Sequence, residues 1–363
     1  MPHTPRNRLK FRTNLRRPHG ASVALGTPVV RRTIPGEFYS LEDGLGLRRI
    51  EVDGRTKTEV LELAPALASL PDVEEAIRGR ASRYGDLDMR LFAPVKRIER
   101  EGPSLRIVSE TPEGVRLSHL LAHLQSTGEV VPTSAILELS SLVIHAVAAL
   151  HSWPGGLAHG TINPAHALLT NDGRIMLTDC VFGAGLEVLQ RNREQLWKDF
   201  GLAMPLVASL ARFDQNADVT QMGALILAIL LHRPLRITEY PRGLSDLVTM
   251  ATELSSTPGA PDSTLALRMW LQQALQIHPR LAFRSAVDAQ RSFADTTGTT
   301  ASRRAGVTAL QVFLRTTCSE VRKQPALVVH ARRPSGGRSV VPSAEVSQPF
   351  DSILRAVLSN AAH

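Results

Sequence analysis

The segment from residue 159 to 180, HGTINPAHALLTNDGRIMLTDC, carries the side chains best suited to chemistry. An imidazole such as His166 can move a proton, and a carboxylate such as Asp179 is the kind of ligand that hard cations prefer. Further histidines stand at positions 145, 151 and 159. Because the intervals among these histidines do not match zinc-ligand spacing, we expect core or surface histidines and no metal site.

A β-hairpin is predicted to hold the second half of this segment. The runs HALLT and RIMLTD flank Asn171-Asp172-Gly173, which is a strong turn signal. The remainder of the chain beyond about residue 113 has helical periodicity, with long apolar stretches at 135–150, 218–231 and 266–276. We therefore expect a mainly helical region that carries one hairpin.

The first third of the chain is predicted to be rich in strands. Leu47–Val52 and Thr58–Leu63 surround an Asp53-Gly54 turn, and FAPVKRIE and SLRIVSE read as two more strands. Between these pairs, PDVEEAIRGRAS begins with proline and has acids in its first turn, which favours a helix. The expected fold class is α+β, with a small β-rich lobe followed by a larger helical lobe.

Composition excludes several classes of protein. The chain of 363 residues is 43% hydrophobic and 21% charged, as expected of a globular protein with a real core. Its longest apolar run, residues 223–231, is about half of the roughly 20 residues that a membrane-spanning helix needs. The first twenty residues have no apolar stretch, and two cysteines are too few for a disulfide framework. We expect a cytoplasmic protein without a membrane span.

The positive charge lies in the tails. The net charge is +8, yet residues 1–36 have eight basic and no acidic side chains, and residues 301–363 have nine basic and three acidic ones. The body between them is therefore acidic. Such tails are interpreted as solvated extensions, and nucleic acid is an unlikely partner because no aromatic residues alternate with the charges. Contact between the basic tails and nucleic acid remains an alternative.

Four segments carry a resemblance to a known family. In order, they are LRIVSETPEGVRLSHLL, HAVAALHSWPGGLAHG, NADVTQMGALILAILLHRPL and ALQIHPRLAFRSAVDAQRSF. They resemble the hinge region, the helix before the catalytic loop, the central helix and the last two helices of a bacterial-type Ser/Thr protein kinase domain. The resemblance covers residues 37–293 and implies a bilobal protein kinase-like fold.

The resemblance also implies a domain organisation. A basic, disordered tail over 1–36 precedes the small lobe with its hinge at 37–112, and the large lobe spans 113–295. Residues 296–363 form a basic extension with one or two short helices and a linker. Ser109 stands at the gatekeeper position, and Glu110, Thr111 and Pro112 stand at the hinge that would contact a nucleotide.

At the positions of the family's catalytic loop, this sequence departs from the pattern. Thr161 replaces the aspartate that accepts the substrate's proton, and a neutral hydroxyl is no base at ordinary pH. Asn163 replaces the lysine near the transferred phosphate. His166 replaces the metal-binding asparagine, although magnesium prefers oxygen ligands. His159 matches a structural histidine of the family and is expected to pack beneath the loop.

The motif Asp-Phe-Gly of the family reads Asp179-Cys180-Val181 here. Its carboxylate survives, so Asp179 is left open between a residual metal or nucleotide contact and a bond to nearby groups of the chain. Magnesium and ATP are doubtful cofactors on this pattern. In the small lobe, Gly44 and Gly46 suggest only a turn rather than a phosphate-binding loop.

The remaining charge positions of the family are also altered. The strand TEVLEL has no lysine, because Lys57 is expected in the preceding turn, and Glu62 stands near the lysine's place. Glu74 and Glu75 are therefore expected to be solvated acids of a first helical turn. Counting back from Asp218, the family's buried aspartate, places Met204-Pro205-Leu206 at an Ala-Pro-Glu motif, and Ala282 replaces its arginine partner.

These substitutions predict a catalytically inactive kinase-like domain, a pseudokinase. It would act by binding a protein partner, such as an active kinase or another signalling protein, as a scaffold or allosteric regulator. One alternative is an atypical phosphotransferase with a rearranged site that uses Asp179 and His166. Another is a nucleic-acid-associated protein that binds through its basic tails.

Overall fold

The computed structural model describes residues 40–53, 56–110, 112–206, 211–255, 261–297 and 300–323. All of these residues belong to one compact unit. The predicted tail over 1–36, hinge residue Thr111, and the predicted linker and last helix after residue 323 lie outside the described residues.

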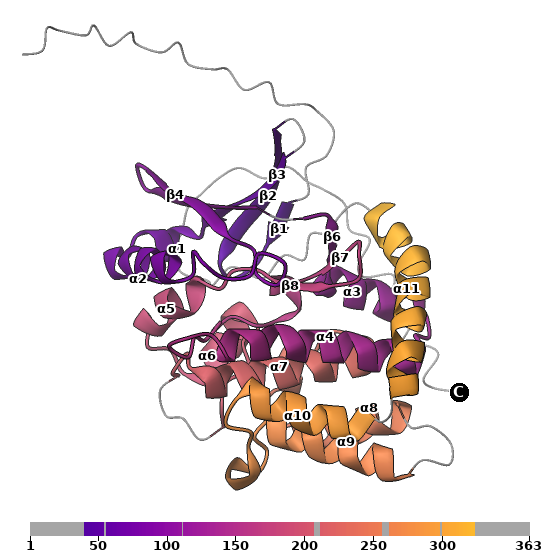
Figure 1. Cartoon of the computed structure of the whole chain (residues 1–363). Coiled ribbons are helices and arrows are strands. Elements are labelled where there is room, and N and C mark those ends of the chain that lie inside the picture. The colour runs from indigo at the N-terminus through magenta and orange to yellow at the C-terminus, as the bar shows by residue number, and fades with distance from the viewer. Residues whose placement is uncertain are drawn as a thin grey trace, which may run out of the picture. The chain divides into compact units, whose positions relative to one another are not determined.

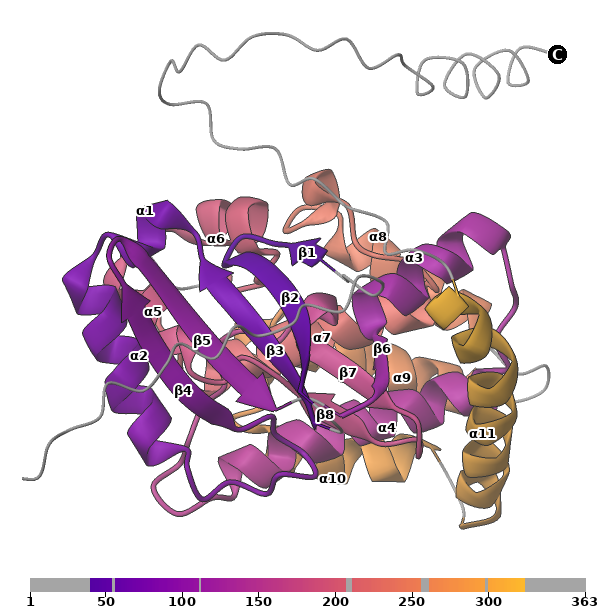
Figure 2. The same ribbon diagram turned by 90° about the horizontal axis from the view of Figure 1, so that it is seen from above.

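The first part of this unit is a five-stranded antiparallel sheet (Figures 1 and 2). Its spatial order is β1-β2-β3-β5-β4. The strands are β1 (Ser40–Glu42), β2 (Gly46–Asp53), β3 (Thr56–Leu63), β4 (Val95–Glu101) and β5 (Ser104–Glu110). Lys57 pairs with Val52 inside the β2–β3 ladder, so its predicted place in the turn was wrong.

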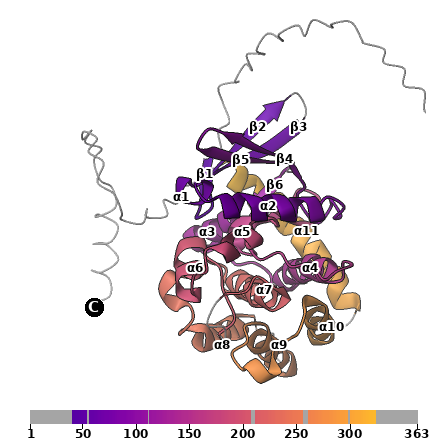
Figure 3. The ribbon, with the colours of Figure 1, turned by 90° about the vertical axis from the view of Figure 1, so that its left-hand side faces the viewer.

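Helices α1 (Pro65–Ala68) and α2 (Pro71–Arg83) follow β3. Proline at the start of α2, acids in its first turn and arginines in its last turn all favour the helix at that position. Its apolar side chains Val73 and Ile77 are buried. In Figure 3, α2 lies between the sheet and helix α5 (Phe182–Val188). The helix therefore connects the sheet to the segment that follows Asp179.

The second part is largely helical and includes a small sheet. The sheet has the order β6-β7-β8, with β6 (Gly114–Arg116), β7 (Ala167–Thr170) and β8 (Ile175–Leu177). The helices are α3 (Leu117–Thr127), α4 (Thr133–His151), α6 (Arg193–Phe200), α7 (Gln215–Leu230), α8 (Leu244–Leu254), α9 (Pro261–Ala274) and α10 (Ala286–Thr297). Three short 3-10 turns complete it: η1 (Pro164–His166), η2 (Ile237–Glu239) and η3 (Pro279–Leu281). The predicted fold class and the predicted hairpin are confirmed.

Helix α4 is long and apolar enough to cross a membrane by length and composition, with a mean hydropathy of 1.7. In this structure it is a core helix that packs against α7, α10 and α11 (Thr300–Lys323). Val143, Ile144 and Leu150 of α4 are at most 1% exposed. A helix covered on several sides needs apolar residues around most of its circumference, which explains the composition.

Helix α11 is longer than the short helix expected in the C-terminal extension, with 24 residues. It crosses α4 (Figure 1) and buries one face formed by Gly306, Leu310, Phe313, Thr317 and Val321. This spacing of three and four residues is that of one helical face. At Gly306, an added Cβ would lie 2.9 Å from the carbonyl oxygen of Ser134. The glycine thus permits the close crossing of α11 over α4.

One apolar cluster extends from the five-stranded sheet into the helical part. Leu45 of the turn between β1 and β2, Leu61 of β3 and Ile77 of α2 belong to it. From the helical part it includes Phe182, Leu196 and Met204, among others. The two lobes therefore share a packed apolar core on this side of the interface between them.

Candidate functional site

Asp218, at the start of α7, fixes the backbone of the loop that begins at His159. Its carboxylate accepts the backbone N–H groups of His159 and Gly160, each at 2.6 Å. The ring Nε2 of His151 lies 3.0 Å from the same carboxylate, and Asp218 is fully buried. Because a buried carboxylate needs such donors, this arrangement accounts for the charge at position 218.

Two further side chains hold the loop, one from α7 and one from the small lobe. Gln221 of α7 accepts the N–H of Ile162 at 2.7 Å and donates to the carbonyl of Gly160 at 3.0 Å. From the small lobe, the Tyr84 hydroxyl donates to the carbonyl of Ala158 at 2.5 Å. These bonds hold the loop as a rigid element between the lobes.

Thr161, which the resemblance places at the position of the family's proton-accepting aspartate, is buried, and its hydroxyl is hydrogen-bonded. That hydroxyl donates to the backbone carbonyl of Asp179 at 3.0 Å and lies 3.2 Å from Nδ1 of His159. Burial lowers the pKa of His159 to about 4, so this ring is neutral at ordinary pH. The ring and the hydroxyl are therefore neutral groups, and the hydroxyl hydrogen is already donated to the chain.

Asn163 caps the short turn η1. Its side-chain oxygen accepts the N–H groups of Ala165 and His166 at 2.8 and 3.1 Å. Its amide donates to the carbonyl of Phe200 at 3.1 Å. Capping of this kind is a common structural role for asparagine, and it leaves no cation where the family has its lysine.

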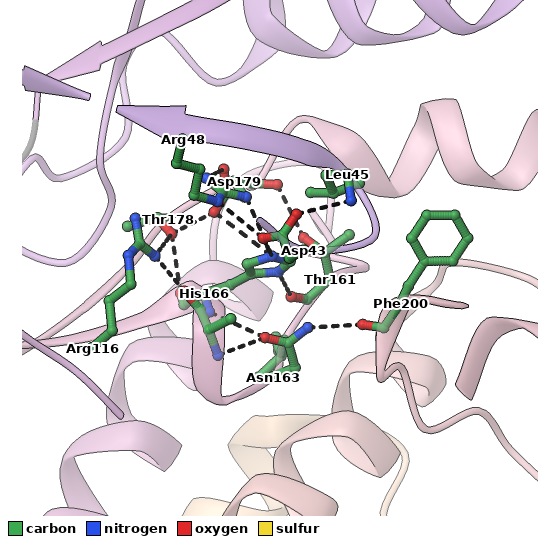
Figure 4. Close-up of polar contacts among 12 residues, drawn as sticks. Asp43, Leu45, Arg48, Arg116, Thr161, Asn163, His166, Thr178, Asp179 and Phe200 are labelled. Atoms are coloured by element: carbon green, nitrogen blue, oxygen red, sulfur yellow. Dashed lines mark hydrogen bonds and ion pairs between the residues drawn. The ribbon is translucent and has the colours of Figure 1, made fainter. Parts of the chain in front are cut away.

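His166 lies at the centre of a polar cluster between the lobes (Figure 4). Its Nδ1 donates to the carbonyl of Thr161 at 2.6 Å. Its Nε2 is 3.4 Å from Oδ2 of Asp43 and 3.4 Å from Nη2 of Arg48. The histidine is thus brought to the site, but it faces side chains of the small lobe.

Asp179 has both carboxylate oxygens occupied by the chain itself. Oδ1 accepts from Nη1 of Arg48 at 2.9 Å, and Oδ2 accepts from the Thr178 hydroxyl at 2.6 Å. Burial alone would raise the pKa of Asp179, but the charges of Arg48, His166 and Arg116 and the hydrogen bond from Thr178 together outweigh it and lower the pKa to about 2. Its backbone is in the left-handed region, with φ at 71°. Asp179 is therefore a firmly ionised carboxylate.

The partner of Asp179 is a residue that sequence reasoning missed. Arg48 on β2 also donates to Glu59 Oε1 and to Asp43 Oδ2, both at 2.9 Å. Burial disfavours its charge, yet Asp179, Asp43 and Glu59 together raise the pKa of Arg48 well above its usual value. Arg48 is 2% exposed and forms the hub of the cluster.

A second buried guanidinium completes the cluster. Arg116, the last residue of β6, donates to Glu59 and to the carbonyl of Ala165. It also donates to the Thr178 hydroxyl at 3.3 Å. The guanidiniums of Arg48 and Arg116 and the carboxylates of Asp43, Glu59 and Asp179 together form what we call the interlobe charge cluster. In the part of the chain that the structure describes, no group of three or more His, Cys, Asp or Glu side chains is arranged to hold a metal.

The predicted glycine turn joins β1 to β2 and reaches the large lobe. Asp43 accepts the N–H groups of Leu45 and Gly46 at 2.8 and 3.2 Å, which closes the turn. Gly44 approaches α6 so closely that an added Cβ would lie 2.0 Å from the carbonyl oxygen of Asp199. The turn therefore packs onto the large lobe with its backbone.

The predicted hinge residues are not part of the cluster. Glu110 ends β5, and its half-exposed carboxylate pairs with Lys96 at 2.7 Å. Pro112 is exposed, and Thr111 lies outside the described residues.

Two acids of the small lobe differ from their predicted roles. Glu62 faces outward, where it accepts from the Ser104 hydroxyl at 3.0 Å, and Glu59 is the acid of β3 that points inward. Glu74 is not simply solvated, because it pairs with Arg78 and Arg100.

At Met204, where the resemblance places an Ala-Pro-Glu motif, a tyrosine holds the backbone. The Tyr240 hydroxyl accepts the N–H of Met204 at 2.8 Å and donates to its carbonyl. Its ring packs against Trp197 with centroids 4.8 Å apart. A buried neutral contact thus holds this segment without the charge pair whose loss the sequence predicted.

Comparisons with known proteins agree with this geometry. No family model matches the chain. A stretch of 141 residues is 26% identical to the mouse Serine/threonine-protein kinase PAK 4, covering 39% of this chain. The chain spans about a fifth of that relative, 22% of its length.

Solved structures show the fold. The kinase domain of Mycobacterium tuberculosis PknI matches 71% of this chain and 92% of its own, with a TM-score of 0.51 and 18% identity. The kinase domain of maize SIRK1, a sucrose-induced receptor kinase solved with AMP-PNP, matches 72% of this chain and 93% of its own, with a TM-score of 0.53 and 14% identity. The described residues therefore form a protein kinase-like domain.

Proposed function

We propose that this chain is a kinase-like domain that acts by binding another protein and does not transfer phosphate. The observation that carries this proposal is the pairing of Asp179 with Arg48. In kinases the corresponding carboxylate holds the metal that neutralises the phosphates. Here a metal would have to displace a buried guanidinium, and breaking such a pair costs about 3–5 kcal/mol.

The position of Thr161 supports the same proposal. A phosphotransfer site needs a group that orients or deprotonates the attacking hydroxyl. The Thr161 hydroxyl is buried and already donates to the chain. With Asn163 bonded to the backbone, neither position offers a free charge to a phosphate.

The packing between the lobes is a third line of support. Leu45 lies in the apolar cluster shared by both lobes, and Gly44 packs on the backbone of Asp199. A nucleotide placed between these elements would have to separate them. The packed fold is a stable scaffold that offers no free charge to a phosphate. This favours a role in binding a partner, such as an active kinase or another signalling protein.

The catalytic part of the proposal is tested with nucleotide. The purified full chain is heated with ATP alone, with ATP and Mg²⁺, and with ATP and Mn²⁺, and label transfer from γ-labelled ATP is measured alongside. We expect no metal-dependent rise in Tm and no transferred label. A metal-dependent rise together with label transfer would establish the alternative, a phosphotransferase with a rearranged site.

The binding part is tested with partners. Proteins captured by the full chain are purified, and binding is then remeasured with the two components alone. We expect at least one active kinase or signalling protein to bind at micromolar concentration and to change its activity. If binding is instead to nucleic acid, falls steeply with salt and is absent for residues 37–323, which keep α11, the basic tails carry the function.

A further inference from the structure

Helix α11 follows the last of the kinase-like segments and crosses α4 (Figure 1). Within the described part of α11, the face opposite the buried one is exposed, and it includes Arg304, Thr308, Gln311 and Arg315. These positions recur at intervals of three and four residues and therefore lie on one side of the helix. The helix is thus held to the rest of the molecule by its inner side.

Leu314 of α11 packs on the hairpin turn that joins β7 to β8. A Cβ added at Gly173 in this turn would lie 3.3 Å from Cδ1 of Leu314. The same turn is tied to the residue that precedes β6, because the N–H of Asn171 donates to the carbonyl of Glu113 at 3.2 Å. Helix α11 also packs on β6 itself. It therefore supports the β6–β7–β8 sheet from the outside, at the end where the hairpin turns.

The C-terminal half of α11 reaches the loop that follows α3. The hydroxyl of Thr317, which is 1% exposed, donates to Oε1 of Glu129. The other oxygen of this carboxylate, Oε2, lies 3.7 Å from Nε2 of His123 on α3. Glu129 therefore links α11 to α3, which α11 also contacts directly.

The elements that α11 supports carry the large-lobe side of the interlobe charge cluster. Arg116 ends β6, immediately precedes α3 and donates to Glu59 of the small lobe. Asp179 follows β8 by two residues and pairs with Arg48. Because β7 pairs with both β6 and β8, a shift of this sheet would displace Arg116 and Asp179 together. Buried ion pairs are stable only in good geometry, so the position of the sheet decides whether the cluster is closed.

We propose that α11 is a strap whose docking on α4 is coupled to closure of the interlobe charge cluster, because Leu314 and Thr317 hold the small sheet and α3 where Arg116 reaches Glu59. By linkage, lifting α11 loosens the cluster, and opening the cluster weakens the docking of α11 by the same factor. A helix held by one side opens at a lower free energy than the whole domain. The inference goes beyond the proposed function, because it concerns control of the contact between the lobes and requires no partner.

Hydrogen exchange of the full chain, followed by mass spectrometry, tests the coupling. Gly306→Gln should lift α11, because even an added Cβ would lie 2.9 Å from the carbonyl oxygen of Ser134. Thr308→Gln, on the exposed face of α11, is the matched control. In Gly306→Gln we expect exchange to rise by roughly fivefold or more in α11, in β6 and in β3, which carries Glu59. Exchange in α8 should keep the wild-type rate, and the control should match wild type throughout.

The reverse change tests the reciprocity of the coupling. Glu59→Gln removes the charge that Arg116 meets and keeps the size of the side chain, and Glu62→Gln, on the outward face of the same strand, is its control. We expect Glu59→Gln to raise exchange in α11 as well as in β3 and β6, whereas Glu62→Gln should leave α11 at the wild-type rate.

The inference is overturned if Gly306→Gln raises exchange in α11 while β6 and β3 keep their wild-type rates, or if Glu59→Gln leaves α11 unchanged. A uniform rise that includes α8 would also overturn it, because it would show general destabilisation. If Gly306→Gln does not fold, the double variant Leu314→Ala, Thr317→Val replaces it, and the same rates in β6 and β3 decide. Label transfer from ATP by wild type would end the proposed function alone and leave this inference standing.

Discussion

Two buried aspartates of this domain, Asp218 and Asp179, stand where the kinase family has aspartates, yet their surroundings differ. Asp218 accepts two backbone N–H groups and contacts His151, so its charge positions a loop. Asp179 is paired with Arg48 and with a threonine hydroxyl. The comparison teaches that the partners of a buried carboxylate decide whether its charge is available to a ligand.

The largest loss of stability is expected on removal of Asp218, because its carboxylate holds the backbone of the loop. Asp218→Ala would leave two buried N–H groups without an acceptor, and we expect a loss of about 4 kcal/mol in the free energy of unfolding. Urea denaturation measures it. Asp86→Ala, at an exposed position, is the matched control and should stay within about 0.5 kcal/mol. Equal losses in the two variants would contradict the structural role of Asp218.

Removal of Arg48 should be the next largest effect. Arg48→Met leaves three carboxylates with Arg116 alone, and we expect a loss of about 3 kcal/mol. Adding Asp179→Asn should recover part of it, since one uncompensated charge disappears. A double-mutant cycle by urea denaturation reports the coupling, and Arg49→Met, on the exposed side of β2, serves as control. A cycle without coupling would contradict the pairing.

The pH dependence of stability should report on the pairing of Asp179. The pKa of Asp179 is lowered to about 2 from its ordinary value of 3.8. The unfolded chain therefore takes up this proton first as the pH falls. The stabilisation, on the order of 2 kcal/mol, is fully present above about pH 5 and is lost between about pH 4 and pH 2. Asp179→Asn should flatten the stability curve in that window, and an unchanged curve would contradict the lowered pKa.

The smallest effect is expected at the turn that covers the cluster. Gly44→Ala places a Cβ against the carbonyl of Asp199, and we expect a loss of about 1–2 kcal/mol because the turn can shift. The control is Gly79→Ala in α2, where an added Cβ meets open space. That variant should gain about 0.5–1 kcal/mol from helix propensity. Thermal unfolding of both variants measures the changes, and a Gly44→Ala variant as stable as wild type would contradict the packing of the turn on α6.

The sequence predicts the elements and the loop better than it predicts the cluster. Strand alternation, the Asn171-Asp172-Gly173 turn and the apolar periods of α4, α7 and α9 are local signals, and the structure contains each element. The burial of Asp218 also followed from its place in the order of segments. Local patterns suffice for these features because the interactions that decide them lie within a few residues.

The role of Arg48 could not be predicted, because it depends on contacts between distant segments. Arg48 and Asp179 are 131 positions apart in the chain. The β2–β3 register places Glu59 opposite Ile50, two residues along from Arg48 and on the same face. Charged residues at inward positions of two paired strands were the available signal. Without the register, the sequence placed Glu62 near the position of the family's lysine, and Glu62 faces outward.

The apolar cluster that runs from Leu45 through Phe182 to Met204 has a consequence for how the molecule unfolds. Opening a gap between the lobes would expose this packed surface to water, at roughly 25 cal/mol per Å² of apolar area. Hinge-like breathing of the two lobes is therefore energetically linked to melting of the whole. Because the two lobes share this core, we expect the sheet and the helices to unfold in one cooperative transition.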